Sequence, residues 1–456
     1  MSRAKFEEII HHIEELAESG ELKLGSRLPS IRSLADTFSC SLNTVIKAYK
    51  ELEFGHKIYA VRKSGYYLVE DFPYKKQRGA GETIYDFLSA GPDKHAMPYL
   101  DYKHCMNQAI DRYKEDMFTY SELLGLFSLR EELARHLRDL QVFTTPERIA
   151  VTTGSQQALH LLIRLPFPNG KQTILTEQPA HPSFIESLKH QPSAGIDIGR
   201  DGPDLQELET IFQKGDIKFF YVVSRFHNPT GHGYTNEEKR KIVELAERYD
   251  VYILEDDYMG DLDPDLKQDP MFAYQPNGRV IYTKSFSKTL LPGLRLGLAV
   301  LPLELIERFT KAKFAADVHT PVITQGALEI YLKNGMFAAH IKKIRKLYRK
   351  KGEMLRQAYQ TLMPDGTIYT CPPSGFYSTV RLPSPLKAEE LIQRLKEKHV
   401  SVQSTKSMYL EAFMRHDELR LSVSHVEDDM IGGGVALMAE TIQEMMIERK
   451  KGVIWR

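Results

Sequence analysis

The sequence has few cysteines and no net charge. Only three cysteines occur among 456 residues, Cys40, Cys105 and Cys371, and none has CxxC spacing. This usage excludes a disulfide scaffold and a zinc ribbon, and it predicts a reducing, cytoplasmic environment. Lysine plus arginine and aspartate plus glutamate both number 61. The chain as a whole is therefore not attracted to polyanions, which does not exclude a local basic face.

Long hydrophobic segments are also lacking. No stretch approaches the about 18 apolar residues of a membrane span, and the longest apolar runs, such as 219–223, have the length of a strand. The glutamate-rich N-terminus has no apolar core of a signal peptide. The 42% hydrophobic and 27% charged residues are typical of a globular protein, and the length predicts two to four domains. We expect a multidomain cytoplasmic protein without membrane association.

Residues 1–71 have the pattern of three short helices followed by a hairpin. Apolar side chains recur every three or four positions over three segments, at residues 6–17, 31–38 and 45–52. Ser30 and Ser41 precede the second and third segments and suit helix N-caps. Two β-rich stretches follow, at 57–61 and 65–69, around a basic turn.

The exposed face of the third predicted helix carries side chains that suit DNA. Asn43 can read an adenine edge, and serine and threonine suit phosphates or bases. The hairpin tip would bring Lys63 to a phosphate backbone. The same pattern also fits a three-helix protein-interaction module with a solvated charged face.

The order of these residues resembles the GntR-type winged helix over nearly the whole segment. The matching features are Leu28-Pro29-Ser30, Arg32, Leu34-Ala35, Ser41, Thr44-Val45, Ala48-Tyr49, Leu52 and the wing glycine Gly65. The resemblance implies a domain that binds a double-stranded DNA operator. The DNA contacts that it implies are Arg32, Ser41, Asn43, Thr44, Lys47 and Lys63.

A different pattern begins after residues 72–82, which contain proline and two glycines and are typical of a short linker. From residue 83 to residue 456, strand-like and amphipathic stretches alternate. The strands are expected at 149–153, 173–177, 217–223, 251–255, 279–283 and 296–301. This alternation predicts an α/β fold with a mostly parallel sheet, flanking helices and a smaller C-terminal subdomain.

A lysine and an arginine follow one of these strands in a pattern that suits a phosphorylated aldehyde. Strand 279–283 leads into Ser285, Ser287 and Lys288, and Arg295 comes seven residues later. Serine hydroxyls and a guanidinium suit a phosphate dianion, and a lysine amine forms Schiff bases with aldehydes. Alone the pattern is weak, because most lysines are solvated surface residues.

Three other predicted strands also end in polar residues. Asp256 and Tyr258 follow 251–255, at the sheet edge where open α/β sheets bind ligands, and a buried aspartate keeps a pyridine nitrogen protonated. Ser155 and Gln156 begin a helix whose free N–H groups suit a phosphate. Asn228 lies in an Asn-Pro-Thr-Gly turn. Each also has an ordinary interpretation, as an acidic loop, a capped helix or a β-turn.

The order of these motifs, closed by Arg-Leu-Ser at 420–422, resembles the fold-type I aminotransferases over about residues 83–445. The likeness implies pyridoxal 5′-phosphate as cofactor, with Lys288 as its aldimine lysine and Asp256 on the pyridinium nitrogen. It implies Asn228 and Tyr258 on the 3′-oxygen and Arg420 on an α-carboxylate. The implied phosphate ligands are Ser155, Gln156, Ser285, Arg295 and, from a partner subunit, Tyr120.

A winged helix ahead of such a domain resembles the MocR/GabR-type transcriptional regulators. This implies a homodimeric regulator whose aminotransferase fold senses a small amino compound by external aldimine formation. The alternatives are a competent aminotransferase with an accessory DNA-binding domain, and a DNA-binding protein whose large domain only dimerises. The intact Lys288, Asp256 and Arg295 argue against the last of these.

Three features depart from the pattern of related proteins. His181 stands where an aromatic residue, commonly tyrosine, stacks on the cofactor ring, so the stacking partner is open. Asn228 is retained as in true aminotransferases, which leaves catalysis open. The linker is short for the family, which limits how far the two domains can separate.

Overall fold

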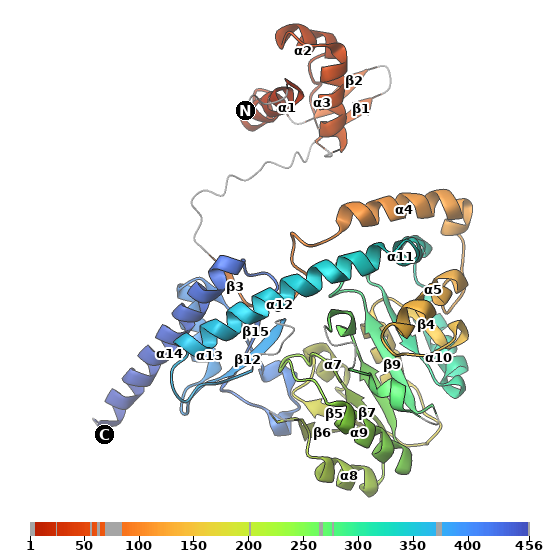
Figure 1. The fold of residues 1–456 in the computed structure, drawn as a ribbon, viewed down its shortest axis with the longest axis vertical. Coiled ribbons are helices and arrows are strands. Elements are labelled where there is room, and N and C mark those ends of the chain that lie inside the picture. The colour runs from red at the N-terminus through yellow and green to blue at the C-terminus, as the bar shows by residue number, and fades with distance from the viewer. Residues whose placement is uncertain are drawn as a thin grey trace. The chain divides into compact units, whose positions relative to one another are not determined.

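The computed structural model describes residues 5–23, 25–54, 57–61, 64–68, 84–199, 202–263, 268–275, 278–370 and 376–454. The chain divides into two compact units, residues 1–82 and 83–456 (Figure 1). The predicted linker, 72–82, and the predicted wing residue Lys63 lie outside the described residues. Within the described ranges, every helix falls short of the length and apolarity needed to traverse a bilayer.

The first unit contains the three helices and the hairpin that the sequence predicts. Its elements are α1 (Lys5–Glu18), α2 (Ile31–Thr37), α3 (Leu42–Phe54), β1 (Ile58–Val61) and β2 (Gly65–Leu68), the strands being antiparallel. Ser30 caps α2 by accepting from the Ser33 N–H, and the Ser41 hydroxyl accepts from the Thr44 N–H at 3.2 Å. The apolar stripes of the helices meet in one small core, in which Tyr49 donates to the Pro29 carbonyl.

A seven-stranded sheet forms the centre of the second unit. Its strand order is β4 (Ile149–Thr152), β10 (Gly297–Val300), β9 (Val280–Ser285), β8 (Tyr252–Asp256), β7 (Ile217–Val222), β5 (Thr173–Gln178) and β6 (Ser193–Asp197). Strand β10 is antiparallel to both neighbours, and the other pairs are parallel. The predicted mostly parallel sheet is confirmed. Strand β6 was not predicted, because its sequence contains just one large apolar side chain.

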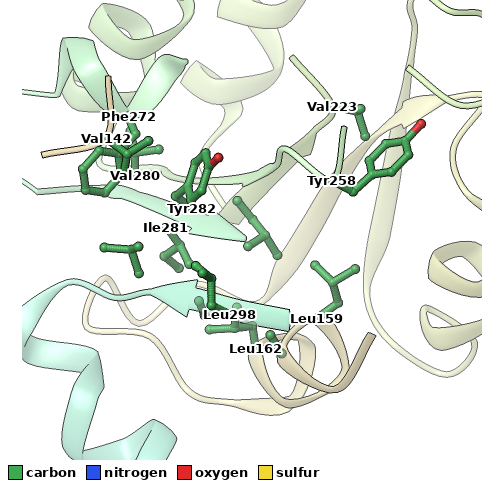
Figure 2. Close-up of a cluster of buried hydrophobic side chains, with 14 of the residues drawn as sticks. Val142, Leu159, Leu162, Val223, Tyr258, Phe272, Val280, Ile281, Tyr282 and Leu298 are labelled. Atoms are coloured by element: carbon green, nitrogen blue, oxygen red, sulfur yellow. The ribbon is translucent and has the colours of Figure 1, made fainter. Parts of the chain in front are cut away.

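Helices cover the sheet and enclose its apolar side chains. They include α5 (Phe127–Arg138), α6 (Ser155–Arg164), α9 (Asn236–Arg248), α10 (Leu303–Asp317) and α11 (Val322–Lys333). Every residue of β7 and of β8 is buried, as expected for strands covered on both faces. Figure 2 shows Leu159 and Leu162 of α6 beside Leu298 of β10, with the Tyr258 hydroxyl at the margin of the cluster. Truncating one such aliphatic side chain to alanine costs about 2–5 kcal/mol.

A smaller subdomain has its own core. It contains the antiparallel sheet β11 (Ile368–Tyr369), β12 (Tyr377–Arg381), β15 (Glu418–Ser422) and β14 (Gln403–Ser404), with α12 (Met336–Leu362), α13 (Ala388–Glu397) and α14 (Ile431–Ile454). Strand β3 (Tyr85–Asp86) pairs in parallel with β13 (Val400–Ser401). The first described residues of the second unit are therefore attached to its C-terminal part.

Candidate functional site

A cradle for a phosphate lies where β4 leads into α6. Gly154 caps the ten-residue helix with φ +76° and ψ 161°, and Ser155 begins it. Arg295 reaches this helix N-terminus from the loop after β9, and its Nη1 lies 3.2 Å from the Ser287 hydroxyl. A Cβ at Gly154 would lie 2.6 Å from Arg295 Nη2. Helix N–H groups, hydroxyls and a guanidinium fork converge here, and this set of donors suits a phosphate dianion.

Asp256 is a buried carboxylate held by two hydroxyls. Tyr221 donates to its Oδ2 at 3.0 Å and Thr283 donates to its Oδ1 at 3.1 Å. Burial raises the pKa of Asp256 to about 6, although both hydrogen bonds favour the charged form. The neighbouring Asp257 has different partners, Arg225 and Tyr282, and its pKa is lowered. Asp256 is therefore the member of the pair that can exchange a proton with a ligand near neutral pH.

Lys288 is the lysine of its segment that remains available to a ligand. Its ammonium donates to the carbonyl of Ala90 and lies 5.6 Å and 5.7 Å from the ring centroids of Phe376 and Tyr377. Lys284, four residues earlier, is fully buried and pairs with Asp261 at 2.6 Å. The two amines thus differ in role: Lys284 belongs to an internal ion pair, and Lys288 is half-buried.

Arg420 lies on β15, an inner strand of the sheet in the smaller subdomain. It is 6% exposed, and its guanidinium donates to the Leu88 carbonyl and lies 5.5 Å from the Tyr377 ring. Burial lowers the pKa of Arg420, and the nearby Tyr377 and Tyr258 oppose that shift. A buried guanidinium bonded to one neutral carbonyl keeps donors free for a carboxylate.

The structure places His181 beside both cations. His181 caps α7 (Pro182–Ser187), and its Nδ1 lies 2.6 Å from the Ser183 hydroxyl, which donates to Gln156 Oε1. Burial, followed by the positive charges of Lys288 and Arg420, lowers the pKa of His181 to about 4. At neutral pH the imidazole is therefore uncharged.

Three buried polar atoms of this region have no hydrogen-bond partner among the described residues. They are the amide oxygen of Asn228, Nε of Arg420 and the hydroxyl of Tyr377. Tyr258, between them, donates to the Phe226 carbonyl at 2.7 Å. Buried unpaired polar groups are costly, and those of Arg420 and Tyr377, whose ring lies 5.5 Å from the guanidinium, indicate a polar ligand at this point. The cradle, Asp256, Lys288 and these groups fit pyridoxal 5′-phosphate.

Tyr120 is not joined to this cluster by any contact within the described chain. Its ring is 87% exposed and lies edge-on to His319, with Phe118, 84% exposed, close to it in sequence. Phe118 and Tyr120 are thus two large aromatic side chains that this copy of the chain leaves exposed.

The predicted DNA-contacting residues lie on the surface of α3 and its surroundings. Arg32, Ser41, Asn43 and Lys47 are exposed, and Thr44 is half-buried with its hydroxyl 2.9 Å from that of Ser41. The Lys47 ammonium lies 3.8 Å above the Phe6 ring of α1.

Several residues of the site were not found in the sequence. Tyr377 and Tyr221 belong to none of the recognised motifs, and a tyrosine in a strand is usually a packing residue. The carbonyls of Leu88 and Ala90 belong to the backbone and have no side-chain signature. The only signal for this segment was its position directly after the predicted linker.

Comparison with known proteins covers both units. The model of the bacterial regulatory proteins of the gntR family matches residues 5–68, and that of the class I and II aminotransferases matches residues 95–435. The uncharacterized HTH-type transcriptional regulator YcxD of Bacillus subtilis is 41% identical over 440 residues, 95% of this chain and 99% of that protein. The 2-aminoadipate transaminase of Thermus thermophilus is 30% identical over 80% of this chain and 91% of its own length.

Solved structures share the fold of the second unit. A kynurenine aminotransferase of Pyrococcus horikoshii, in complex with PMP, superposes with a TM-score of 0.74 at 27% identity, over 80% of this chain and 92% of that one. The α-aminoadipate aminotransferase LysN of Thermus thermophilus, complexed with N-(5′-phosphopyridoxyl)-L-leucine, gives 0.72 at 27% identity, over 80% and 93%.

Proposed function

We infer the function from the family: the chain belongs to the HTH-type transcriptional regulators in which a gntR-family DNA-binding domain precedes a class I and II aminotransferase domain. We propose that the large domain binds pyridoxal 5′-phosphate and an amino compound with a carboxylate, and that this binding changes affinity for an operator. One observation carries the proposal. The phosphate cradle, Asp256, Lys288 and Arg420 are all retained in a chain that also contains the winged helix.

Each residue of the candidate site has a distinct role in this proposal. The cofactor, when bound, supplies an aldehyde for an amine and an electron-withdrawing ring. Asp256 would hold a proton on the ring nitrogen. Asn228 would bond the 3′-oxygen together with Tyr258, whose hydroxyl would leave the Phe226 carbonyl to do so. The phosphate would be held by Ser155, Gln156, Ser285 and Arg295, and His181 would pack against the ring. Arg420 binds the carboxylate of the amino compound through its guanidinium fork.

We also propose a homodimer. Tyr120 would reach the phosphate of the partner's site, which explains why so large a ring is exposed. Winged-helix dimers read paired half-sites, so two copies of the first unit suit a palindromic operator. Sedimentation equilibrium tests the dimer, and Tyr120→Ala tests the shared site through cofactor affinity.

The sharpest test of the cofactor assignment uses two lysines in one stretch of chain. The protein is loaded with pyridoxal 5′-phosphate, reduced with borohydride and digested, and the modified peptide is sequenced by mass spectrometry. The label should be on Lys288 and not on Lys284, because Lys284 is buried in its ion pair with Asp261. A label on Lys284, or labelling of Lys288→Ala to the wild-type extent, contradicts the assignment.

Operator binding is tested separately from cofactor binding. Duplexes selected from a random pool by the full-length protein should share a motif. Removing residues 1–71 should abolish their retention. Retention by the truncated protein would contradict the assignment of DNA binding to the winged helix.

A second candidate function is aminotransferase catalysis. It is favoured by Asn228, which this chain retains together with Asp256, Lys288 and Arg420. Incubating the loaded protein with each amino acid and an excess of α-keto acid distinguishes the two. Many turnovers per site would favour the enzyme, and a single partial turnover with a change in DNA affinity favours the regulator.

A further inference from the structure

A strap of main-chain carbonyls, residues 87–90, is hydrogen-bonded to two residues of the candidate site, Arg420 and Lys288. Four successive carbonyl oxygens of this strap each accept a hydrogen bond from outside it. Two of these bonds come from serines: the Ser422 N–H donates to Phe87 O at 2.9 Å, and the Ser424 hydroxyl donates to Ser89 O at 3.3 Å. Neither donor belongs to the ligand-binding groups proposed above.

The other two bonds come from the two cations of the candidate site. The Arg420 guanidinium donates to Leu88 O, and the Lys288 ammonium donates to Ala90 O. Along the strap, bonds from structural groups therefore alternate with bonds from groups that a ligand would engage.

The strap is anchored on both sides, and Ala90 also packs against the core of the large domain. Phe87 is fully buried in the core of the smaller subdomain. Beyond the other end, Asp93 pairs with Lys351 at 2.6 Å. Between these points the Asp86 carboxylate accepts from the N–H groups of Leu88 and Ser89, at 3.1 Å and 2.9 Å.

We propose that the strap transmits ligand binding at the candidate site toward the winged helix. This inference rests on the proposed function. A carboxylate forms stronger hydrogen bonds with a guanidinium than a neutral carbonyl does, so a ligand carboxylate takes Arg420 from Leu88. The Lys288 amine, after its ammonium has given a proton to solvent, would form a C=N bond with the aldehyde carbon of the cofactor while the aldehyde oxygen leaves as water. Ala90 O would then lose its ammonium donor. The bonds to Phe87 and Ser89 persist.

Two properties of the chain support this role. The strap follows β3 directly, and the chain leads from there to the winged helix, whose last strand ends at Leu68. The two ligand-dependent bonds also respond to different events, because the cofactor engages Lys288 and only a carboxylate engages Arg420. The strap therefore distinguishes the loaded protein from the protein with bound amino acid. An amine without a carboxylate should bind and fail to signal.

A matched pair of ligands tests the strap directly. N-(5′-phosphopyridoxyl)-L-leucine carries a carboxylate, and the corresponding adduct of 3-methylbutylamine lacks only that group. Backbone hydrogen exchange is measured on the full-length protein with each adduct. Both should slow exchange at the cradle, residues 153–157. Only the leucine adduct should accelerate exchange of the Leu88 and Ser89 amides, by threefold or more.

The outcomes separate this inference from the function on which it rests. If the leucine adduct protects the cradle and leaves the Leu88 and Ser89 amides unchanged or slower, the strap proposal is overturned and the cofactor site stands. If neither adduct protects the cradle, the proposed function fails, and the strap proposal fails with it.

Coupling to DNA is tested with a matched pair of variants at Asp86. Asp86→Ala removes the acceptor of the two strap N–H groups, and Asp86→Asn keeps an acceptor and removes the charge. With the selected operator, the leucine adduct should change the dissociation constant of wild type and Asp86→Asn by threefold or more. Asp86→Ala should lose this response and keep ligand-free operator affinity within twofold.

Two results would overturn the coupling. One is a wild-type response in Asp86→Ala. The other is loss of the response in Asp86→Asn as well, since the relevant property would then be the charge near Arg420 and not the strap. If Asp86→Ala does not fold, Ser424→Ala, which removes the donor to the Ser89 carbonyl, replaces it with the same expected loss and the same contradicting result.

Discussion

Replacing Gly154 by alanine tests the phosphate cradle at one atom. At φ +76° and ψ 161° the backbone adopts a conformation that is nearly restricted to glycine, so alanine costs about 1–3 kcal/mol of stability. The added Cβ would also lie 2.6 Å from Arg295 Nη2. Because Nη2 is the far end of a flexible side chain, Arg295 moves and the cradle loses its guanidinium.

Losing one hydrogen bond to a charged group costs about 1.5–3 kcal/mol, which is about 10–150-fold in affinity. Fluorescence titration of Gly154→Ala with pyridoxal 5′-phosphate should show this loss, and calorimetry should show a lower melting temperature. The matched control is Gly293→Ala, two residues before Arg295, where a Cβ meets nothing within 4 Å. If Gly154→Ala binds the cofactor as tightly as wild type, the phosphate lies elsewhere and the reasoning is refuted.

Other predictions concern the residue proposed for the ring nitrogen, the binding of the amino compound and the binding of DNA. Burial raises the pKa of Asp256 to about 6, so this carboxyl is protonated below pH 6. The affinity of wild type for the cofactor should therefore fall about tenfold for each pH unit below 6, and Asp256→Asn should lack that component. Tyr377→Phe removes an unpaired buried hydroxyl, so it should weaken amino-compound binding by about 2–12-fold in a titration and leave the melting temperature unchanged or higher. Asn43→Ala should cost about 1–3 kcal/mol at the selected operator and relax its sequence preference, and Arg32→Ala should lower the log–log salt slope of binding by about one.

The parts of the site that the sequence predicts are side chains at strand ends. Lys288 and Asp256 follow neighbouring strands whose carboxyl ends meet at one sheet edge, so order along the chain was enough to propose that they lie near one another. The helix caps Ser30 and Ser41 were predictable for a similar reason, since capping depends on adjacent residues.

The remaining features depend on contacts that sequence spacing does not encode. The bond from Lys288 to Ala90 joins positions 198 residues apart, and a carbonyl acceptor is the same for every residue type. The reversed direction of β10 was not predicted, because a short apolar strand has the same pattern in either direction. The low pKa of His181 likewise arises from burial and from two cations that are far from it in the sequence but near it in the fold.

The central claim is that an amino compound bound at the aminotransferase-like site controls DNA binding. The compound is first found as the amino acid or amine that shifts the absorbance of the cofactor-loaded protein. Titrating the selected operator against wild type and Arg420→Ala, each with and without this compound, then decides the claim. Wild type should change operator affinity about tenfold, a coupling of about 1.4 kcal/mol. Arg420→Ala should keep compound-free affinity and lose the response; a full response at the same concentration would contradict the claim.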